Sequence, residues 1–452
     1  MKKFVSGLFL LLFLCGNMFA QKVSEVKTLT IDEAVNYAIQ NSRTLKSASI
    51  DLEIKKRAKD NCWNVIIPSL TGSATISRVN EYNNMMGSIM SAINSIPEPQ
   101  PTEANYWTFV GNVNAQLNLN LALIQGVKAT KANYEAGLIT WEQNLKETEL
   151  NVRKMFYGIL MQQESISLQE INFDSAKERY EQSKKNFAGG LVPELMLLQA
   201  QVSYENQKPA LEKSKQAFLQ QLDMFAFLLG MPFGTKLQLV GEIKPEFKIL
   251  DAKNLVSQYL NNRLDVQSMR KNLELTRISL AANNLSTYTP SLSLNYGWQP
   301  IISSIDSTDK NTSGSWKNPT DNGSFSATLV WNITNMLPFT SNGQKIKDSK
   351  QNIQKLEIAL QTVLQNAEMQ IHHLVDKLEQ SKDAIATSQR NANLAQKAYE
   401  QTYEAYKAGT QELLDVKDAE NQMNMAKLGL MSEKMNYVTN LLDLEYAVNS
   451  KL

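Results

Sequence analysis

Four short segments of the chain alternate between apolar and polar residues, a period of two that predicts β-strands whose two faces meet different surroundings. In 107–121 nearly every odd position is apolar, while Thr, Asn and Gln fill most even positions. The same alternation, with Ser, Thr or Asn between apolar residues, occurs in 69–77, 291–299 and 324–333. Each segment is close to the roughly 9–11 residues that a tilted strand needs to cross a bilayer.

The alternation has two interpretations. Aromatic residues gather toward the ends of these segments, as Trp107, Trp298 and Trp331, which is typical of strands that meet a membrane interface. An antiparallel sheet that covers a soluble core has the same period of two. The pattern alone therefore predicts four strands, and other parts of the chain have to decide between a membrane sheet and a soluble one.

The N-terminus has the three parts of a secretory signal peptide. Lys2 and Lys3 form the charged part, 8–14 is the apolar part and Ala20 ends a cleavage site, so 1–20 is expected to be removed. No later run approaches the roughly 18–20 apolar residues of a spanning helix. Export without a helical anchor leaves the periplasm, the outer membrane or the medium as the destination.

Charge, cysteine and histidine content exclude several classes of protein. Removing Lys2 and Lys3 from the 46 basic residues leaves 44, against 45 acidic residues, so no basic field for nucleic acid is expected. Cys62 is the only cysteine after the signal peptide, which excludes an intrachain disulfide. The only histidines, His372 and His373, are adjacent on a predicted helix and diverge, so no metal site is expected. No nucleophile with a base and no phosphate loop indicates an enzyme, and no cofactor is expected.

Long helices are predicted around the strands. Thr30 and Glu33 have the spacing of a capping box and predict a helix that begins at Thr30 and runs to about Ile66. Two segments without proline, 128–187 and 344–407, predict helices of roughly 90 Å at 1.5 Å per residue. Helices of this length need partners along their sides.

The second of these long segments carries a repeat of seven residues that supplies such a contact surface. Its members change from leucine near the start to alanine, serine and threonine toward the end, where helices can approach more closely or face water. A sustained repeat of this kind predicts left-handed coiled-coil packing. The members of this seam are Leu360, Leu364, Ala367, Ile371, Leu374, Leu378, Ser381, Ile385, Ser388, Ala392, Ala395, Tyr399, Thr402 and Tyr406.

The chain contains two copies of one arrangement of elements. Pro68, at a predicted helix-to-strand turn, recurs 222 residues later as Pro290, and Gly190, at a helix-to-helix turn, recurs 219 residues later as Gly409. Each copy predicts helix, strand, loop, strand, very long helix, turn and helix. This is a two-copy fold, since short solenoid repeats have much shorter periods.

The expected organisation is a signal peptide at 1–20, a first structural repeat at 21–230, a linker at 231–253 and a second structural repeat at 254–452. The linker is rich in Pro and Gly, and its short alternating stretch 237–239 predicts one strand packed outside the helices. The segments 80–103 and 301–322 are expected to be the long external loops of a barrel.

Four membrane strands are too few to close a barrel. Lipid cannot satisfy the N–H and C=O groups of a sheet edge, and the smallest barrels need about eight strands. Two, three or four copies of the chain would supply about eight, twelve or sixteen strands. The expected fold is therefore mainly α with membrane β: long coiled helical hairpins plus four strands that contribute to an oligomeric barrel. Polar faces rich in Asn and Ser suit a water-filled interior, and three copies are favoured, although spacing does not select that number.

An ordered set of features then carries a resemblance. It comprises the helix opening at Thr30, the turns at Pro68 and Pro290, the duplicated hairpins and the run 406–419, YKAGTQELLDVKDA. This set resembles the TolC family of outer-membrane efflux proteins over nearly all of the mature chain. The resemblance implies a homotrimer whose twelve strands form one outer-membrane barrel, continued by a long periplasmic tube of coiled helices. It also implies a passive exit duct of a tripartite efflux or type I secretion system, joined to an inner-membrane transporter through a periplasmic adaptor (membrane fusion protein).

The resemblance also implies a periplasmic gate. Asp415 and Asp418 match paired aspartates that ring the family's periplasmic entrance, and Tyr406 matches a tyrosine that helps to hold this entrance closed. Gln411 stands where the best-known members have an arginine, and Met196 where they have an aspartate. We therefore expect an acidic ring that favours cations and a closure that depends more on packing than on salt bridges. The alternative for the two aspartates is a solvated helix face.

Four turn residues, Gly190, Leu191, Gly409 and Thr410, match the family's hairpin tips, which meet the adaptor. Their alternative role is simple helix termination. A second class of protein also stays open, a periplasmic coiled-coil scaffold or adaptor of the cell envelope whose strands form a soluble sheet. That reading leaves the aromatic-ended strands without a purpose, so the expected location is the outer membrane, with lipid around the strands and a long periplasmic extension in a Gram-negative-type envelope.

Overall fold

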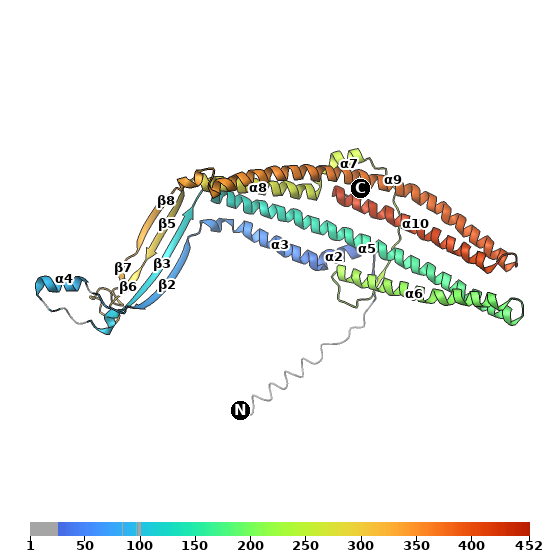
Figure 1. Cartoon of the computed structure of the whole chain (residues 1–452), viewed down its shortest axis with the longest axis horizontal. Coiled ribbons are helices and arrows are strands. Elements are labelled where there is room, and N and C mark those ends of the chain that lie inside the picture. The colour runs from blue at the N-terminus through green and yellow to red at the C-terminus, as the bar shows by residue number, and fades with distance from the viewer. Residues whose placement is uncertain (1–25, 84, 96, 98–100) are drawn as a thin grey trace, which may run out of the picture. The chain divides into compact units, whose positions relative to one another are not determined.

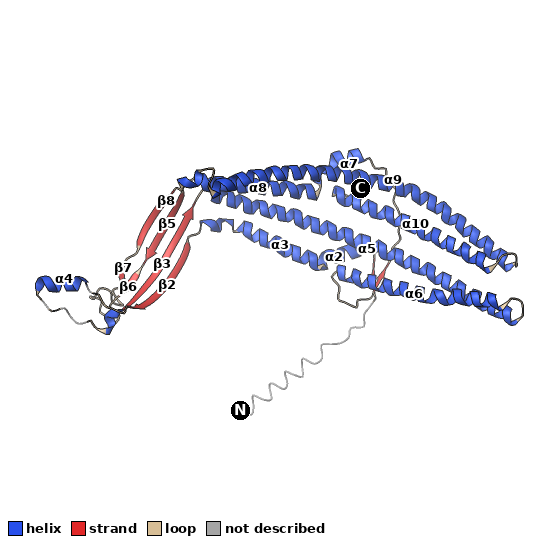
Figure 2. Cartoon of the chain, in the orientation of Figure 1, coloured by secondary structure: helices blue, strands red, loops and turns tan. Residues whose placement is uncertain are grey.

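The computed structural model describes residues 26–83, 85–95, 97 and 101–452, so the expected signal peptide lies outside the described residues. The chain is mainly helical, with a smaller share of strand (Figure 1), and Figure 2 shows the two kinds of element by colour. The described residues form two compact units. The first comprises residues up to 51 with 138–268 and 360–452, and the second comprises 52–137 with 269–359.

The helices include two of 67 residues each. The α-helices are α2 (Ile31–Asn41), α3 (Arg43–Asp60), α4 (Met85–Asn94), α5 (Ala122–Ala188), α6 (Glu194–Leu228), α7 (Ala252–Tyr259), α8 (Leu264–Tyr288), α9 (Ser341–Lys407) and α10 (Leu413–Val448). Short 3-10 helices are Cys62–Ile66, Glu103–Tyr106, Leu260–Asn262 and Ile333–Met336. The strands are β1 (Lys27–Leu29), β2 (Ser69–Arg78), β3 (Trp107–Leu119), β4 (Leu237–Leu239), β5 (Ser291–Trp298), β6 (Pro300–Ile302), β7 (Thr320–Asp321) and β8 (Ser324–Val330).

The second unit contains an antiparallel sheet whose four long strands are the four predicted ones. β2, β3, β5 and β8 pair in that order, with β6 and β7 pairing beside β3 beyond the end of β5. The prediction of four strands is confirmed, although β3 ends at Leu119 and β8 at Val330, short of the predicted ends. Within the described residues, β2 and β8 have no strand on their outer sides.

The register of the sheet places most apolar residues of the four strands on one face, with Val110 and Val330 as exceptions. Polar residues share the other face, where the Ser293 hydroxyl donates a hydrogen bond to Asn118 Oδ1 at 2.8 Å. Apolar rows across the sheet are Ile76–Phe109, Leu70–Ala115–Tyr296–Phe325 and Leu119–Leu292–Leu329, and a polar row is Ser69–Gln116–Asn295–Ser326. In the single chain the apolar face is open, since Leu70 is 72% and Leu329 68% exposed. An apolar surface this continuous marks contact with protein or membrane.

The two predicted loops contain structure that the pattern did not show. α4 occupies the middle of 80–103, and β6 and β7 form a short pair within 301–322 and its flanks. β6 is separated from β5 because Pro300 has no backbone N–H that could donate a hydrogen bond to a neighbouring strand. Gly111 of β3 faces this proline so closely that an added Cβ would lie 3.0 Å from Pro300 Cγ.

The prediction of one helix from Thr30 to about Ile66 is wrong in its extent. The start is confirmed, because the Thr30 N–H donates to Glu33 Oε2 at 2.8 Å. The helix is interrupted at Ser42, whose ψ of 127° is extended, and α3 then ends at Asp60. Gly230 approaches the chain closely at this interruption, since a Cβ added to it would lie 2.3 Å from the Asn41 carbonyl oxygen.

The two long helices are confirmed and slightly exceed their predicted bounds, reaching about 100 Å each at 1.5 Å per residue. Every member of the predicted seam of α9 is buried or half-buried, while most positions between them are exposed. In the first unit the seam packs on α10, where Ile371 and Leu378 share a core with Tyr437 and Leu444. None of the helices in the described part of the chain combines the length and the hydropathy needed to span a membrane.

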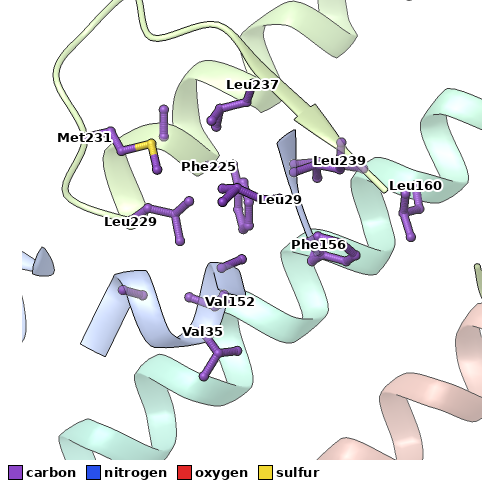
Figure 3. Packing of buried hydrophobic residues seen from close by; sticks show 14 of the residues in the cluster. Leu29, Val35, Val152, Phe156, Leu160, Phe225, Leu229, Met231, Leu237 and Leu239 are labelled. Atoms are coloured by element: carbon purple, nitrogen blue, oxygen red, sulfur yellow. The ribbon is translucent and has the colours of Figure 1, made fainter. Parts of the chain in front are cut away.

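A second core of the first unit lies where the linker meets the helices (Figure 3). The predicted strand at 237–239 is confirmed as β4, and it pairs in parallel with β1, which the sequence did not predict. Leu29 from β1 and Leu239 from β4 are buried with Phe156 of α5 and Phe225 of α6. The linker therefore contributes side chains to this core, and the core fixes α5 against α6.

Candidate functional site

The turn between α5 and α6 forms the first hairpin tip. Gly190 has a φ of +68°, which only glycine adopts without strain, and an added Cβ there would meet nothing within 4 Å. The N–H groups of Gly190 and Leu191 donate to the carbonyls of Phe187 and Asn186 at 2.9 and 2.8 Å. This pattern closes the C-terminus of α5, and it leaves the Leu191 side chain 77% exposed at the tip.

The turn between α9 and α10 forms the second tip with the same chemistry. Gly409 has a φ of +77°, and the N–H of Thr410 donates to the Ala405 carbonyl at 3.0 Å, as Leu191 does to Asn186. The Thr410 hydroxyl donates to the same carbonyl at 3.0 Å. All four predicted tip residues thus lie in helix-terminating turns, and both glycines are required there because the backbone adopts a positive φ.

A cleft of about 1100 Å³ lies between the two hairpins near these tips. Of the predicted site residues it brings together Tyr406, Gln411, Gly409 and Leu191, and Met196 also lines it. Its lining carries both signs of charge, with Glu178 and Glu412 among the acids and Lys177 and Lys407 among the bases. The cleft is therefore a mixed-charge surface.

Asp415 and Asp418 lie on the first turns of α10 and do not line this cleft. Both are exposed. The carboxylate of Asp415 also has a local role, because its Oδ2 accepts a hydrogen bond from the Glu412 N–H at 3.1 Å and so caps α10. This cap is a structural role that the sequence analysis did not assign to Asp415.

The structure adds a buried ion pair that the sequence analysis missed. Arg179 of α5 donates two hydrogen bonds to the carboxylate of Glu420 on α10, at 3.2 and 2.7 Å. The two side chains are only 8% and 5% exposed. The pair therefore ties one hairpin to the other close to the cleft. A sequence signal existed, because Glu420 occupies an apolar-repeat position between the buried Val416 and Met423.

Aromatic side chains continue this cluster along α9. Burial raises the pKa of the Tyr399 phenol, with a further contribution from the Glu420 carboxylate and an opposing one from Arg179. Tyr399 stacks on Tyr403 with 6.0 Å between ring centroids, and Lys407 Nζ lies 4.5 Å from the Tyr403 centroid. The hydrogen bond of Lys407 to Glu404 raises the pKa of that ammonium. The approach to the tip is thus packed by aromatic rings and charged side chains.

No group of three or more His, Cys, Asp or Glu side chains that could hold a metal ion occurs in the parts of the chain that the structure describes. His372 and His373 lie side by side on α9. The described site therefore consists of two hairpin tips, a cleft and a buried ion pair.

The sequence and the fold were compared with those of known proteins. No curated protein matches the sequence. Three solved structures share the fold. CusC is 17% identical with a TM-score of 0.73, and the match covers 93% of this chain and 92% of CusC. The Campylobacter jejuni CmeC outer membrane channel is 18% identical with a TM-score of 0.76 (92% of this chain, 85% of CmeC), and the open state of the Neisseria gonorrhoeae MtrE outer membrane channel is 17% identical with a TM-score of 0.68 (93% of this chain, 89% of MtrE).

The model of the outer membrane efflux protein family matches twice, over residues 34–231 and 255–450. Together the two matches include most of the chain. The alternative of a periplasmic scaffold or adaptor is therefore not favoured. The chain belongs to the outer membrane efflux protein family, and it is an outer-membrane efflux channel.

Proposed function

We propose that three copies of this chain form one exit duct, with twelve strands in a single outer-membrane barrel and the helical hairpins in the periplasm. The observation that carries the proposal is the sheet of the second unit. Most of its apolar residues share one exposed face, its Ser, Thr and Asn residues share the other, and the outer sides of β2 and β8 are unpaired within the described residues. Lipid tolerates such a sheet only when it closes on itself.

The proposed organisation is two structural repeats, 21–230 and 254–452, joined by the linker 231–253, after a cleaved signal peptide. The two family matches, one in each repeat, support it. So does the identical hydrogen bond of the two tips, from Leu191 to Asn186 and, 219 residues later, from Thr410 to Ala405. The duct conducts passively and has no catalytic step.

The proposed partners are a periplasmic adaptor and, through it, an inner-membrane transporter that supplies the energy. The adaptor meets the tips formed by Gly190, Leu191, Gly409 and Thr410. Exposure of Leu191 and the open space around both glycines support a contact there, because small residues let another backbone approach closely.

Asp415 and Asp418 are proposed to form an acidic ring at the periplasmic entrance, six carboxylates in the trimer. Their exposure and their three-residue spacing on α10 support this role. Tyr406 and Gln411 are proposed to close the entrance by packing, since both line the cleft between the hairpins. Such a ring attracts cations and repels anions.

Single-channel recording in planar bilayers tests this gate. Replacing Asp415 and Asp418 by asparagine keeps a capping oxygen at position 415 and removes the charge. We expect the preference for K⁺ over Cl⁻ to fall several-fold, with trimer assembly unchanged. The matched control replaces Asp376 and Glu379, two exposed acids with the same spacing on α9, and should leave selectivity as it was. Equal selectivity in the Asp415/Asp418 variant and the parent would contradict the acidic ring.

A further inference from the structure

The helical part of the second unit is strongly basic, although the whole chain is balanced. Its segments 52–66, 122–137, 269–288 and 341–359 carry 13 Lys and Arg against 6 Asp and Glu, whereas the full chain has 46 against 45. The positive charge is thus concentrated where the helices join the sheet. A concentration of this kind predicts an anionic partner.

Within this unit a shallow groove of about 400 Å³ lies between α5 and α8. Its lining joins two kinds of side chain, with Ala132, Ile278 and Ala281 supplying apolar surface and Lys128, Lys131 and Arg277 supplying positive charge. Positive charge along a groove suits an anionic ligand.

The two acids that line the groove share one ammonium group. Glu135 and Glu274 both accept hydrogen bonds from Lys271 Nζ, at 2.7 and 2.6 Å, and these bonds raise the pKa of Lys271. Lys128 and Lys131 are exposed, and among the described residues neither takes part in an ion pair. Lys128 and Lys131 thus outweigh the one carboxylate charge that Lys271 does not balance, and the groove keeps an excess of positive charge.

The position of these lysines fits a membrane surface. β3 ends at Leu119 and α5 begins at Ala122, so Lys128 and Lys131 lie about 9 and 14 Å along the helix from its start. The polar headgroup layer on each side of a bilayer is roughly 5–8 Å thick, and fields reach about a Debye length, near 8 Å, beyond it. Clusters of Lys and Arg next to a membrane segment are typical of sites for anionic lipids.

We propose that the groove between α5 and α8 binds the headgroup of an anionic glycerophospholipid of the periplasmic leaflet, with the phosphate at Lys128 and Lys131 and the acyl chains directed toward the strands. This inference rests on the proposed placement of the sheet in the outer membrane. The site anchors the channel by its headgroup contacts at the depth where strands become helices.

Binding of labelled phosphatidylglycerol to the detergent-purified channel tests the site, with phosphatidylcholine as the zwitterionic comparison. We expect phosphatidylglycerol to bind more tightly, and the Lys128→Gln/Lys131→Gln variant to bind it about 30-fold more weakly, because two cations near an anionic headgroup are lost. The matched control, Lys208→Gln/Lys213→Gln, changes two exposed lysines of α6 and should bind like the parent. Lys128→Arg/Lys131→Arg should also retain binding.

Three outcomes would overturn the inference: equal affinity for the two lipids, unchanged phosphatidylglycerol binding in the Lys128/Lys131 glutamine variant, or full competition by glycerol phosphate, which would mark a simple anion site. Failure of the proposed function is recognised separately. A protein that purifies without detergent and forms no conducting trimer refutes the channel placement, whereas a conducting trimer without lipid preference refutes only the lipid site.

Discussion

Breaking the buried ion pair between Arg179 and Glu420 should destabilise the protein more than any exposed pair. In Glu420→Leu the guanidinium of Arg179, 8% exposed, loses both of its hydrogen bonds to Glu420 and remains enclosed. A charge-assisted hydrogen bond contributes about 1.5–3 kcal/mol, and removal of one partner of a buried pair costs about 3–5 kcal/mol. We expect a loss of this size in the free energy of unfolding.

The assay is denaturant unfolding of the purified protein in detergent, followed by circular dichroism. The Arg179→Leu/Glu420→Leu variant removes both charges, and we expect it to recover most of the loss, because replacing a buried pair by apolar groups is often neutral. The control breaks the exposed pair Lys215–Glu170, 2.8 Å apart and 41% and 47% exposed. Loss of that pair should cost far less than loss of the buried pair, because both partners stay in contact with water.

Two results would refute the reasoning. One is a Glu420→Leu variant no less stable than the Lys215–Glu170 control, which would mean that water or another acceptor reaches Arg179 at little cost. The other is a double variant as unstable as the single one, which would mean that leucine packing, rather than the unpaired charge, causes the loss.

Two further predictions concern a turn and a cap. Gly409→Ala should lower the free energy of unfolding by about 1–2 kcal/mol, because φ is +77° there. The control Gly429→Ala lies in the interior of α10 with open space at the Cβ, and it should raise the free energy of unfolding by about 0.5–1 kcal/mol. Equal effects of the two substitutions in denaturant unfolding would argue against backbone strain at Gly409. The hydrogen bond from the Thr30 N–H lowers the pKa of Glu33, so its stabilising effect is complete above the ordinary glutamate value of about 4.3 and is lost as pH falls through the lower folded value. Thermal unfolding between pH 7 and 3 should thus show a steeper acid loss for the parent than for Glu33→Gln, and parallel curves would contradict this.

The strands and the long helices could be predicted because their signals are local and repeated. Alternation marks β3 over many residues, and the seam of α9 repeats its spacing from Leu360 to Tyr406, so single exceptions do not hide the pattern. The tips could be predicted for a related reason, since Gly190 and Gly409 interrupt helices that otherwise continue. These features depend on neighbours in the sequence.

The features that escaped prediction depend on residues far away in the chain. The interruption at Ser42 accompanies the close approach of Gly230 to the end of α2, and the Arg179–Glu420 pair joins residues 241 positions apart. The capping role of Asp415 was overlooked although Glu412 lies three residues before it. That cap was visible in a short stretch of sequence, whereas for the ion pair only the position of Glu420 among buried apolar residues was.

Among the residues that the structure describes, the outer sides of β2 and β8 are unpaired, and this has a consequence for biogenesis. A single copy placed in lipid would leave roughly five N–H and five C=O groups of β2 without partners, and each such group costs several kcal/mol in hydrocarbon. If the proposed trimer forms, newly exported chains therefore associate with one another before they enter the bilayer. The number of functional pores should then rise more steeply than the rate of synthesis. A defective subunit should also be dominant-negative, because it joins assemblies with normal subunits and inactivates them.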